Sequence, residues 1–397
     1  LRDKTARNDK ETPFFNNLLS NEKGDSVKVS WRIIKKVVVG TIAAIGLVVT
    51  AGCVAWAPNG SSLVVGWSVK NGEESLYTVS ADGGDFAPVP EASVAFMPSI
   101  SPDGREMVFT RPVMDLIHAH LMLRNQATGK VSDLETGVSG PFAWRRDSQW
   151  FVGFAHGLDG SLSAYWYNLN EMGEAMRVKL PFRYVSPLNQ NVIWLPNSDD
   201  IAVLGSTQSP SLKTNVYTVE AGEPHQITKT GDVIGLSITP DGKNLIWARR
   251  SKNAHYILFT LYEFNINKRT VTRLPFPEHV PGINPNPHQG PDMVNYVSFS
   301  PDGQHIAVAV TYDPPQTVGI GTSVLYITNL QGSDAKTVLK APATSRFGFV
   351  GKGGAFIVPF WSEDGKKLAA LDQNGAVWVC NADGSDLHDL NLPPLPQ

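Results

Sequence analysis

A short turn sequence returns seven times along the chain, each time between two β-rich segments. In its fullest form, Pro-Asp-Gly, the proline presets φ, the aspartate bonds its own backbone two residues on, and the glycine accepts a positive φ. The seven occurrences are Pro58–Gly60, Pro102–Gly104, Arg146–Ser148, Pro196–Ser198, Pro240–Gly242, Pro301–Gly303 and Glu363–Gly365. Each predicts a tight connection between two antiparallel strands.

The repeat contains four strand-like segments. Runs of β-branched and aromatic residues flank each turn, as in Val297–Phe299 and Ile306–Val308. A third run such as Val324–Ile327 follows, and a weaker fourth run such as Val271–Leu274 closes the repeat. Four antiparallel strands repeated radially make the blade of a β-propeller. The sequence therefore predicts an all-β protein, a seven-bladed β-propeller with four-stranded antiparallel blades.

The spacing of the turns predicts where the chain is elaborated. The third turn position falls at 60, 104, 148, 198, 242, 303 and 365, so the steps are 44, 44, 50, 44, 61 and 62 residues. A blade needs about 40–45 residues, so the longer steps contain insertions. We expect these insertions, Leu180–Asn191 and Pro275–Tyr296 among them, at the end of the blades opposite the seven turns. We call the two ends the loop-rich face and the turn face.

Each repeat supplies its own four strands in order. We therefore expect the ring to close by packing between the first and seventh blades alone, without exchange of a strand between the termini.

The repeat also resembles a known family. The Ser-Pro-Asp-Gly hairpin at Ser101–Gly104 and Ser300–Gly303, the aromatic third strand and the Asp-Gly-Gly turn at Asp82–Gly84 are similar to the TolB-like propeller repeat, a relative of WD repeats. The resemblance covers residues 54–390 and implies an exported bacterial propeller. A repeat of this kind describes a scaffold and does not specify a chemistry.

Charge argues against nucleic acid as a partner. The chain has 34 basic and 37 acidic residues. Residues 1–53 contain 9 of the basic and 5 of the acidic residues, which leaves 25 basic and 32 acidic residues in 54–397. A nucleic-acid scaffold usually shows a basic stripe instead. Residues 54–397 are long enough for one closed core, and we expect a single propeller domain that is monomeric.

The N-terminal part predicts export. Residues 1–30 are polar and are expected to be disordered or not translated, whereas residues 31–53 combine basic residues, an apolar run and a small-residue end. That order is typical of a secretory signal. Small residues directly before Cys53 resemble a lipobox, which implies that Cys53 is lipidated. An uncleaved membrane anchor and a cleaved, secreted form are the alternatives. All three place the propeller outside the cytoplasm, in the periplasm or beyond, because the basic residues favour the inside.

Catalytic motifs are sparse. The segments nearest to a Gly-x-Ser-x-Gly nucleophile elbow are Gly235–Thr239 and Gly321–Leu325, and both lack the final glycine, which disfavours a serine peptidase. Cys380 has no disulfide partner in sight, and we expect it to be a buried small residue. No cofactor is expected.

Four histidines suggest an alternative function that depends on a bound metal. The positions are His118, at the start of a strand, and His255, His279 and His288, in the connections of other blades. A metal-dependent carbohydrate lyase or lactonase gathers imidazoles at the mouth of its channel. Scattered surface histidines explain the same pattern without a metal.

The segment Pro275–Tyr296 is the most unusual insertion, with six prolines and two histidines. A long proline-rich loop of this kind is functional or an inert insertion. Candidate binding residues on the loop-rich face are Arg249, Arg250, His279, His288, Tyr312 and Arg346. Such residues suit an anionic ligand or a peptide carboxylate.

The resulting hypothesis is a non-enzymatic cell-envelope scaffold. It recognises a protein or peptide partner on the loop-rich face and is held at the membrane through its N-terminus. The alternative is a metal-dependent lyase or lactonase with its site in the central channel. A third interpretation is a structural role in the envelope with no discrete ligand.

Overall fold

The structure is a computed structural model. It describes residues 54–69, 73–112, 119–157, 159–171, 176–186, 189–208, 213–250, 259–277, 280, 293–312, 321–343, 357–372 and 376–393. The predicted disordered, signal and lipidation segments therefore lie outside the described residues, as do five of the proposed site residues. Those five are His118, His255, His279, His288 and Arg346.

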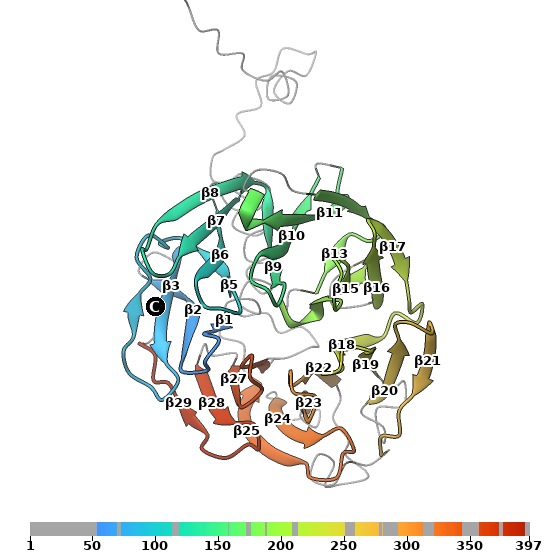
Figure 1. Cartoon of the computed structure of the whole chain (residues 1–397). Coiled ribbons are helices and arrows are strands. Elements are labelled where there is room, and N and C mark those ends of the chain that lie inside the picture. Colours follow the sequence, from blue (N-terminus) through green and yellow to red (C-terminus); the bar gives the residue numbers. More distant parts are fainter. Residues whose placement is uncertain are drawn as a thin grey trace, which may run out of the picture. The chain divides into compact units, whose positions relative to one another are not determined.

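The predicted fold is confirmed: seven antiparallel sheets lie around a common centre (Figure 1). Blade 1 contains β1 (Val54–Trp56), β2 (Ser62–Val69), β3 (Glu73–Ser80) and β4 (Ala87–Pro88). Blade 2 contains β5 (Phe96–Ile100), β6 (Glu106–Arg111), β7 (His120–Asn125) and β8 (Val131–Thr136). Blade 3 contains β9 (Val138–Trp144), β10 (Trp150–His156), β11 (Leu162–Asn168) and β12 (Met176–Leu180), with the short helix η3 (Leu169–Glu171) after β11.

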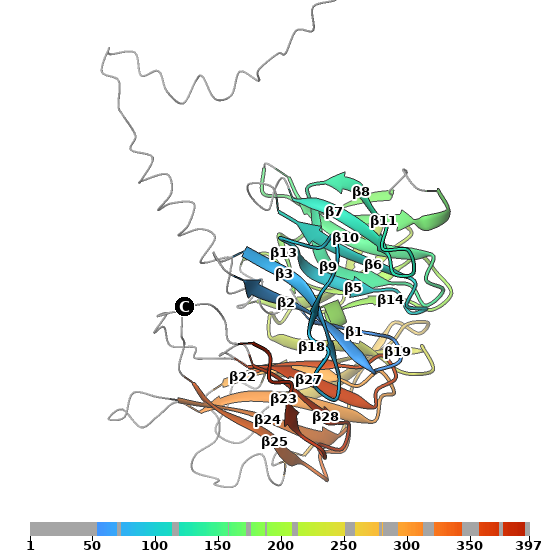
Figure 2. The same ribbon diagram turned by 90° about the vertical axis from the view of Figure 1, so that its left-hand side faces the viewer.

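The remaining blades follow the same order. Blade 4 contains β13 (Tyr184–Val185), the short helix η4 (Asn189–Asn191), β14 (Val192–Trp194), β15 (Ile201–Ser206), β16 (Thr214–Glu220) and β17 (Glu223–Gln226). Blade 5 contains β18 (Val233–Ile238), β19 (Asn244–Arg250), β20 (Phe259–Asn265) and β21 (Thr270–Arg273). Blade 6 contains β22 (Met293–Phe299), β23 (His305–Tyr312), β24 (Gly321–Asn329) and β25 (Lys336–Ala343). Blade 7 contains β26 (Val358–Trp361), β27 (Lys367–Leu371), β28 (Val377–Asn381) and β29 (His388–Asp389). Figure 2 shows the strands of blade 6 side by side in a second view.

The ring closes as the sequence predicts. The first sheet is ordered β1-β2-β3-β4 and the last β26-β27-β28-β29, so the described residues of these two blades exchange no strand. Closure instead uses side chains: Trp56 Nε1 donates to the carbonyl oxygen of Phe360 at 2.8 Å, and His388 Nε2 lies 2.9 Å from the carbonyl oxygen of Ala81. Buried residues of both blades, Val54 and Val358 among them, share one hydrophobic cluster.

The seven turns owe their shape to a repeated hydrogen-bond pattern. In blade 6, Ser300 Oγ donates to Asp302 Oδ1 at 2.5 Å, and the backbone N–H groups of Gln304 and His305 donate to Asp302 and Ser300. Gly303 has a φ of 69°, and a Cβ placed there would lie 2.8 Å from the ring of Pro240 in the preceding blade. The turns therefore pack against one another around the turn face. In repeat four the left-handed residue is Asn197, one position earlier than in the other repeats.

One insertion lies at the loop-rich end of its blade but is partly built into the inner strand. The 50-residue step is six residues longer than the 44-residue steps, and we expected the excess on the loop-rich face. In the structure the innermost strand of blade 4 is interrupted, since β13 and β14 both pair with β15 and η4 lies between them. The excess residues therefore form part of the inner wall of the ring, because the paired strand β15 continues past the interruption.

Hydrophobic clusters fill the spaces between blades. Trp166 and Trp247 are among the largest fully buried side chains. Cys380 is 3% exposed, so the prediction of a buried cysteine is confirmed, and burial raises the pKa of its thiol to about 12. Across the ranges given above, no helix has both the length and the apolar character needed to cross a membrane.

Candidate functional site

The centre of the ring is crossed by a side chain from blade 4. Gln190, in η4, donates from Nε2 to the carbonyl oxygen of Pro359 in β26 at 3.1 Å. Its Oε1 accepts a hydrogen bond of 2.8 Å from Ser298 Oγ in β22. One amide therefore joins the inner strands of blades 6 and 7 to the interrupted inner strand of blade 4.

The next residue extends the same network to blade 5. Asn191 is buried, its Oδ1 accepts from the backbone N–H of Leu236 in β18 at 3.2 Å, and its Nδ2 donates to Ser186 Oγ at 2.7 Å. At this level the protein's own polar side chains occupy the middle of the ring. Sequence reasoning noticed the length of this segment but missed both amides, since nothing in their spacing indicates that they face the centre.

The predicted residues Arg249 and Arg250 end β19 at the loop-rich face, and their side chains serve different interfaces. Because neighbouring strand residues point to opposite faces, Arg250 lies on the side of Ile246 and Ala248, which belong to the cluster shared with blade 6. Arg249 lies on the side of Trp247, whose cluster is shared with blade 4.

Arg249 is fully engaged within the protein. Its Nε and Nη2 each lie 2.9 Å from a carboxylate oxygen of Asp232, and its Nη1 donates to Tyr262 Oη at 3.3 Å. The hydrogen bond to Asp232 raises the pKa of Arg249. Desolvation acts to raise the pKa of Asp232, but its hydrogen bonds to Arg249 and Thr230 outweigh this and lower it. Binding by Arg249 stays a prediction, and it requires this bidentate pair to open.

Arg250 has no such partner. Its Nη2 donates to the carbonyl oxygen of Val294 in β22 at 3.1 Å, whereas its buried Nε has no hydrogen-bond acceptor. Desolvation lowers the pKa of Arg250, and the nearby charge of Asp232 compensates only in part.

The third described candidate, Tyr312, ends β23 on the same side of blade 6. Its Oη lies 3.0 Å from Tyr326 Oη, and its ring packs against the cluster that contains Ala248 and Val294. Desolvation and the hydrogen bond with Tyr326 raise the pKa of Tyr312 well above its usual value. Arg250 and Tyr312 therefore come together at the interface between blades 5 and 6.

A β-bulge in the inner strand of blade 6 turns Asn295 away from this interface, because its partner Thr311 alternates with Val310 and Tyr312, which face blade 5. The pairing of β22 with β23 shifts between Val294 and Tyr296, so Asn295 stands out of register. Asn295 Nδ2 donates to Thr311 Oγ1 at 2.7 Å, but its buried Oδ1 has no donor. The first residues of the proline-rich insertion pack into the cluster between blades 5 and 6, where the rings of Phe276 and Phe259 lie tilted with centroids 4.7 Å apart and Val280 is 2% exposed.

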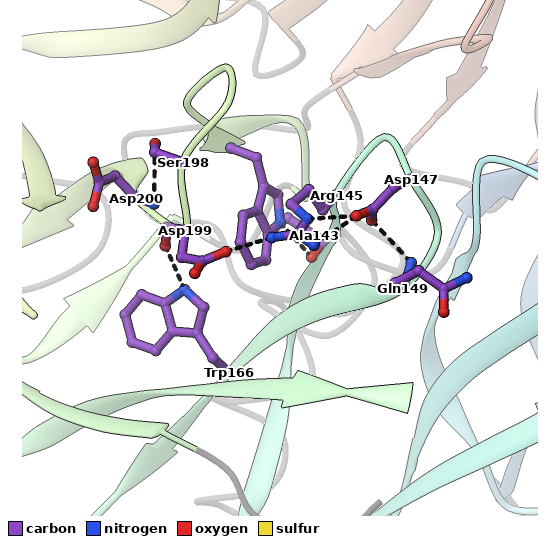
Figure 3. Close-up of polar contacts among 9 residues, drawn as sticks. Ala143, Arg145, Asp147, Gln149, Trp166, Ser198, Asp199 and Asp200 are labelled. Atoms are coloured by element: carbon purple, nitrogen blue, oxygen red, sulfur yellow. Dashed lines mark hydrogen bonds and ion pairs between the residues drawn. The ribbon is translucent and has the colours of Figure 1, made fainter. Parts of the chain in front are cut away.

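Other polar clusters look structural. On the turn face, Arg145 donates to Asp147 from Nε and Nη2 at 2.9 and 2.6 Å and pairs with Asp199 of the next turn (Figure 3). Its guanidinium also lies over the rings of Trp150 and Trp194, 5.1 and 5.7 Å from their centroids. These contacts of Arg145 join blade 3 to blade 4, and they leave Arg145 few donors for a ligand. We call them the Arg145 cluster.

The predicted metal histidines cannot be placed. All four lie outside the described residues, and within those residues no group of three His, Cys, Asp or Glu side chains is arranged to hold a metal ion.

Comparisons with known proteins support the fold. No family model and no curated protein matches the chain. The propeller domain of the Trilobed protease from Pyrococcus furiosus, which has an open velcro topology, matches with a TM-score of 0.54 and 13% identity over 85% of this chain and 94% of that one. Oligogalacturonate lyase in complex with manganese matches with a TM-score of 0.56 and 13% identity over 80% of this chain and 84% of that one.

TolB from Acinetobacter baumannii also matches, at 15% identity over 84% of this chain and 61% of that one. Its TM-score is 0.41, which is too low to support any inference about this chain. Identities this low show a shared propeller fold and no shared activity.

Proposed function

We propose that this propeller is a non-enzymatic scaffold of the cell envelope that binds a protein or peptide partner on its loop-rich face. The proposal includes export, with attachment to the membrane through lipidated Cys53 or an uncleaved anchor. It also retains the TolB-like resemblance of the repeat as a guide to cellular setting.

The observation that carries the proposal is the difference between the two faces. On the turn face, short hairpins pack against one another and satisfy their own polar groups, as Ser300, Asp302 and Gly303 do. At the other end, strands β19 and β23 stop at Arg250 and Tyr312, and in each case eight residues separate that strand from the next. Rigid scaffolds carry binding residues on such connections.

The amides at the ring centre favour a binding role at the mouth over a site within the channel. Gln190 spans from blade 4 to blades 6 and 7 through hydrogen bonds to Ser298 and Pro359. A ligand that entered from the loop-rich face would meet these hydrogen-bonded side chains. The available surface is therefore the loop-rich mouth and the blade interfaces around it.

The test is a crosslinking pull-down from envelope fractions with the full chain as bait. In one variant a short Gly-Ser linker replaces residues 281–292, which keeps the anchors Phe276 and Val280. The matched control is Gln304→Ala, an exposed change on the turn face of blade 6. We expect partners that disappear with the shortened variant and persist with the control. An identical partner list for all three baits would contradict the proposal.

The lyase or lactonase alternative predicts a different result. Purified protein would contain stoichiometric metal that is lost when His118 and His279 are replaced by alanine. It would also cleave a uronate polymer or a lactone without any protein partner. These outcomes would replace the scaffold proposal.

A further inference from the structure

A tryptophan hydrogen bond recurs at four of the seven interfaces between neighbouring blades, which we call joints. In each case the indole lies two residues before the turn, and Nε1 donates to a backbone oxygen three residues before the turn of the preceding blade. The bonds run from Trp56 to Phe360, from Trp144 to Ser99, from Trp194 to Ala143 and from Trp361 to Ser298, at 2.8 to 3.2 Å. The joint between the two ends of the chain, blade 7 to blade 1, is therefore one of the bonded joints.

The other three joints lack this bond because the equivalent residue is not a tryptophan. It is Ile100 in blade 2, Ile238 in blade 5 and Phe299 in blade 6. The tryptophan bonds thus hold together two groups of three blades, 6-7-1 and 2-3-4 (Figure 1). Blade 5 is the blade without a tryptophan bond on either side.

Two of the three joints without a tryptophan bond have other polar contacts. Between blades 4 and 5, Arg269 Nη1 lies 2.8 Å from Glu220 Oε1. Between blades 1 and 2, Arg124 Nε donates at 3.3 Å to the carbonyl oxygen of Pro90, which lies in the connection from blade 1. Blade 5 therefore extends the 2-3-4 group, and the joint between blades 5 and 6 is the weakest candidate that remains.

Between the described strands of blades 5 and 6, one hydrogen bond crosses the joint, from Arg250 Nη2 to the carbonyl oxygen of Val294. Its donor is poorly accommodated in the closed joint. Arg250 Nε is buried without an acceptor among the described residues, and the nearby carboxylate of Asp232 is bound by Arg249. A guanidinium stays charged in proteins, and an incompletely paired buried charge is costly. Opening the joint would hydrate Arg250 and recover part of that cost.

The chain connection at this joint is also the longest. Residues 274–292, 19 in number, separate β21 from β22, and the next longest connection, 14 residues at 344–357, lies at a joint that has the Trp361 bond. Holding together the ends of a longer connection costs more conformational entropy. Apolar side chains of both blades, Ala248 and Val310 among them, fill the blade 5–6 joint. Apolar packing is non-directional, so it resists opening without fixing one arrangement.

We propose that the ring opens at the joint between blades 5 and 6 and stays closed where the first and last blades meet. The inference goes beyond the proposed function, because it concerns the ring itself and needs no partner. It is the reverse of what connectivity alone suggests, since a ring built from one chain has no covalent link between its ends. Gln190, which links blade 4 to blades 6 and 7, limits how far the joint can open.

The test measures how often a buried thiol in each joint becomes accessible in the full-length protein. Ala248→Cys places a thiol in the blade 5–6 joint and Ala369→Cys places one in the blade 7–1 joint, and both alanines are 0% exposed. The native Cys380, 3% exposed in the cluster between blades 6 and 7, is the internal reference. N-ethylmaleimide is added under native conditions, and mass spectrometry of the digest gives the rate at each cysteine. Each rate is divided by that of the same site in urea-unfolded protein.

We expect the thiol of Ala248→Cys to react about tenfold faster than Cys380 or more, as a local opening requires, since one hydrogen bond of typical net strength is worth roughly that factor. The thiol of Ala369→Cys should react no faster than Cys380. Equal rates at all three sites would mean that thiols react only after global unfolding, and this would overturn the inference. A reaction of Ala369→Cys as fast as that of Ala248→Cys, or faster, would overturn it as well.

A second pair of variants separates the joint from the effect of the added sulfur. Phe299→Trp supplies the missing indole at the blade 5–6 joint, where the equivalent acceptor is the backbone oxygen of Ser237. Ile100→Trp supplies it at the joint between blades 1 and 2 and is the matched control. In the Ala248→Cys protein, Phe299→Trp should slow the reaction roughly tenfold and Ile100→Trp should leave it unchanged. Equal rates with the two replacements would contradict an opening at the blade 5–6 joint.

Discussion

Gln190 donates a hydrogen bond to the backbone oxygen of Pro359, 169 residues further along the chain, across the centre of the ring. The same amide accepts from Ser298, so a single side chain connects blades 4, 6 and 7. In a ring whose described ends meet through side chains and share no strand, a link across the centre restrains blades that are not neighbours.

Removing that link should destabilise the propeller. In Gln190→Ala, Ser298 Oγ and the Pro359 carbonyl lose their partner, and unsatisfied buried groups cost about 1–3 kcal/mol. Urea unfolding measures the change, with the exposed Gln226→Ala in β17 as the control. Equal midpoints for the two variants would show that the central amide contributes nothing.

Ring closure depends on the indole of Trp56, which bonds the Phe360 carbonyl at 2.8 Å. Trp56→Phe should be more destabilising than Trp247→Phe by roughly 1 kcal/mol, the usual net value of a hydrogen bond. Both tryptophans are buried, but Nε1 of Trp247 has no partner to lose. Thermal or urea unfolding of both variants makes the comparison. A larger loss for Trp247→Phe would mean that packing volume outweighs the closing hydrogen bond.

The closing interface should also depend on pH. The ring nitrogens of His388 lie 2.8 and 2.9 Å from the carbonyl oxygens of Asp386 and Ala81, and only the protonated imidazole can donate to both. Desolvation acts to lower the pKa of His388, but these hydrogen bonds outweigh it and raise the pKa above its usual value.

A raised pKa in the folded state fixes the sign of this effect. The contribution of His388 is fully present below the unfolded-state pKa, about 6.5, and is lost as pH rises through the higher folded-state value. Unfolding measured from pH 5.5 to 8.5 should therefore show a fall in stability that His388→Gln reduces. An identical pH profile for the variant would contradict the assignment.

The Arg145 cluster on the turn face predicts that replacing this arginine, even by lysine, lowers the stability of the protein. Arg145→Lys keeps the charge but cannot bond Asp147 and Asp199 together while lying over Trp150 and Trp194. We expect about 1 kcal/mol of destabilisation in urea unfolding, given that the Arg145 side chain is only 25% exposed. The neighbouring Arg146→Lys is the control and should be neutral. An unchanged free energy of unfolding in Arg145→Lys would show that the Arg145 cluster does not contribute to stability.

The repeat made the fold predictable because each turn is a local device. Ser300, Asp302 and Gly303 are close in sequence, and their hydrogen bonds and φ follow from turn chemistry alone. Seven such turns, spaced by about the length of one blade, are enough to predict a seven-bladed propeller. They also fix which strand ends lie at the loop-rich face, so Arg249, Arg250 and Tyr312 were placed at the correct end.

The site was less predictable because it depends on contacts between blades. Arg249 and Arg250 are adjacent and chemically identical, yet one meets Asp232 and the other meets only a backbone oxygen. Which of them finds a carboxylate depends on strand direction and on the twist of neighbouring sheets. Gln190 was missed for the same reason, since its partners come from blades that the repeat pattern treats as equivalent.

The most direct test of the loop-rich face is site-specific photo-crosslinking in the cell. Benzoylphenylalanine is introduced at Thr322, which is exposed beside Tyr312 on blade 6, or at Gln304, which is exposed at the opposite end of the same blade. The scaffold account predicts a discrete covalent adduct from position 322 and none from position 304. An adduct from position 304, with none from position 322, would contradict it.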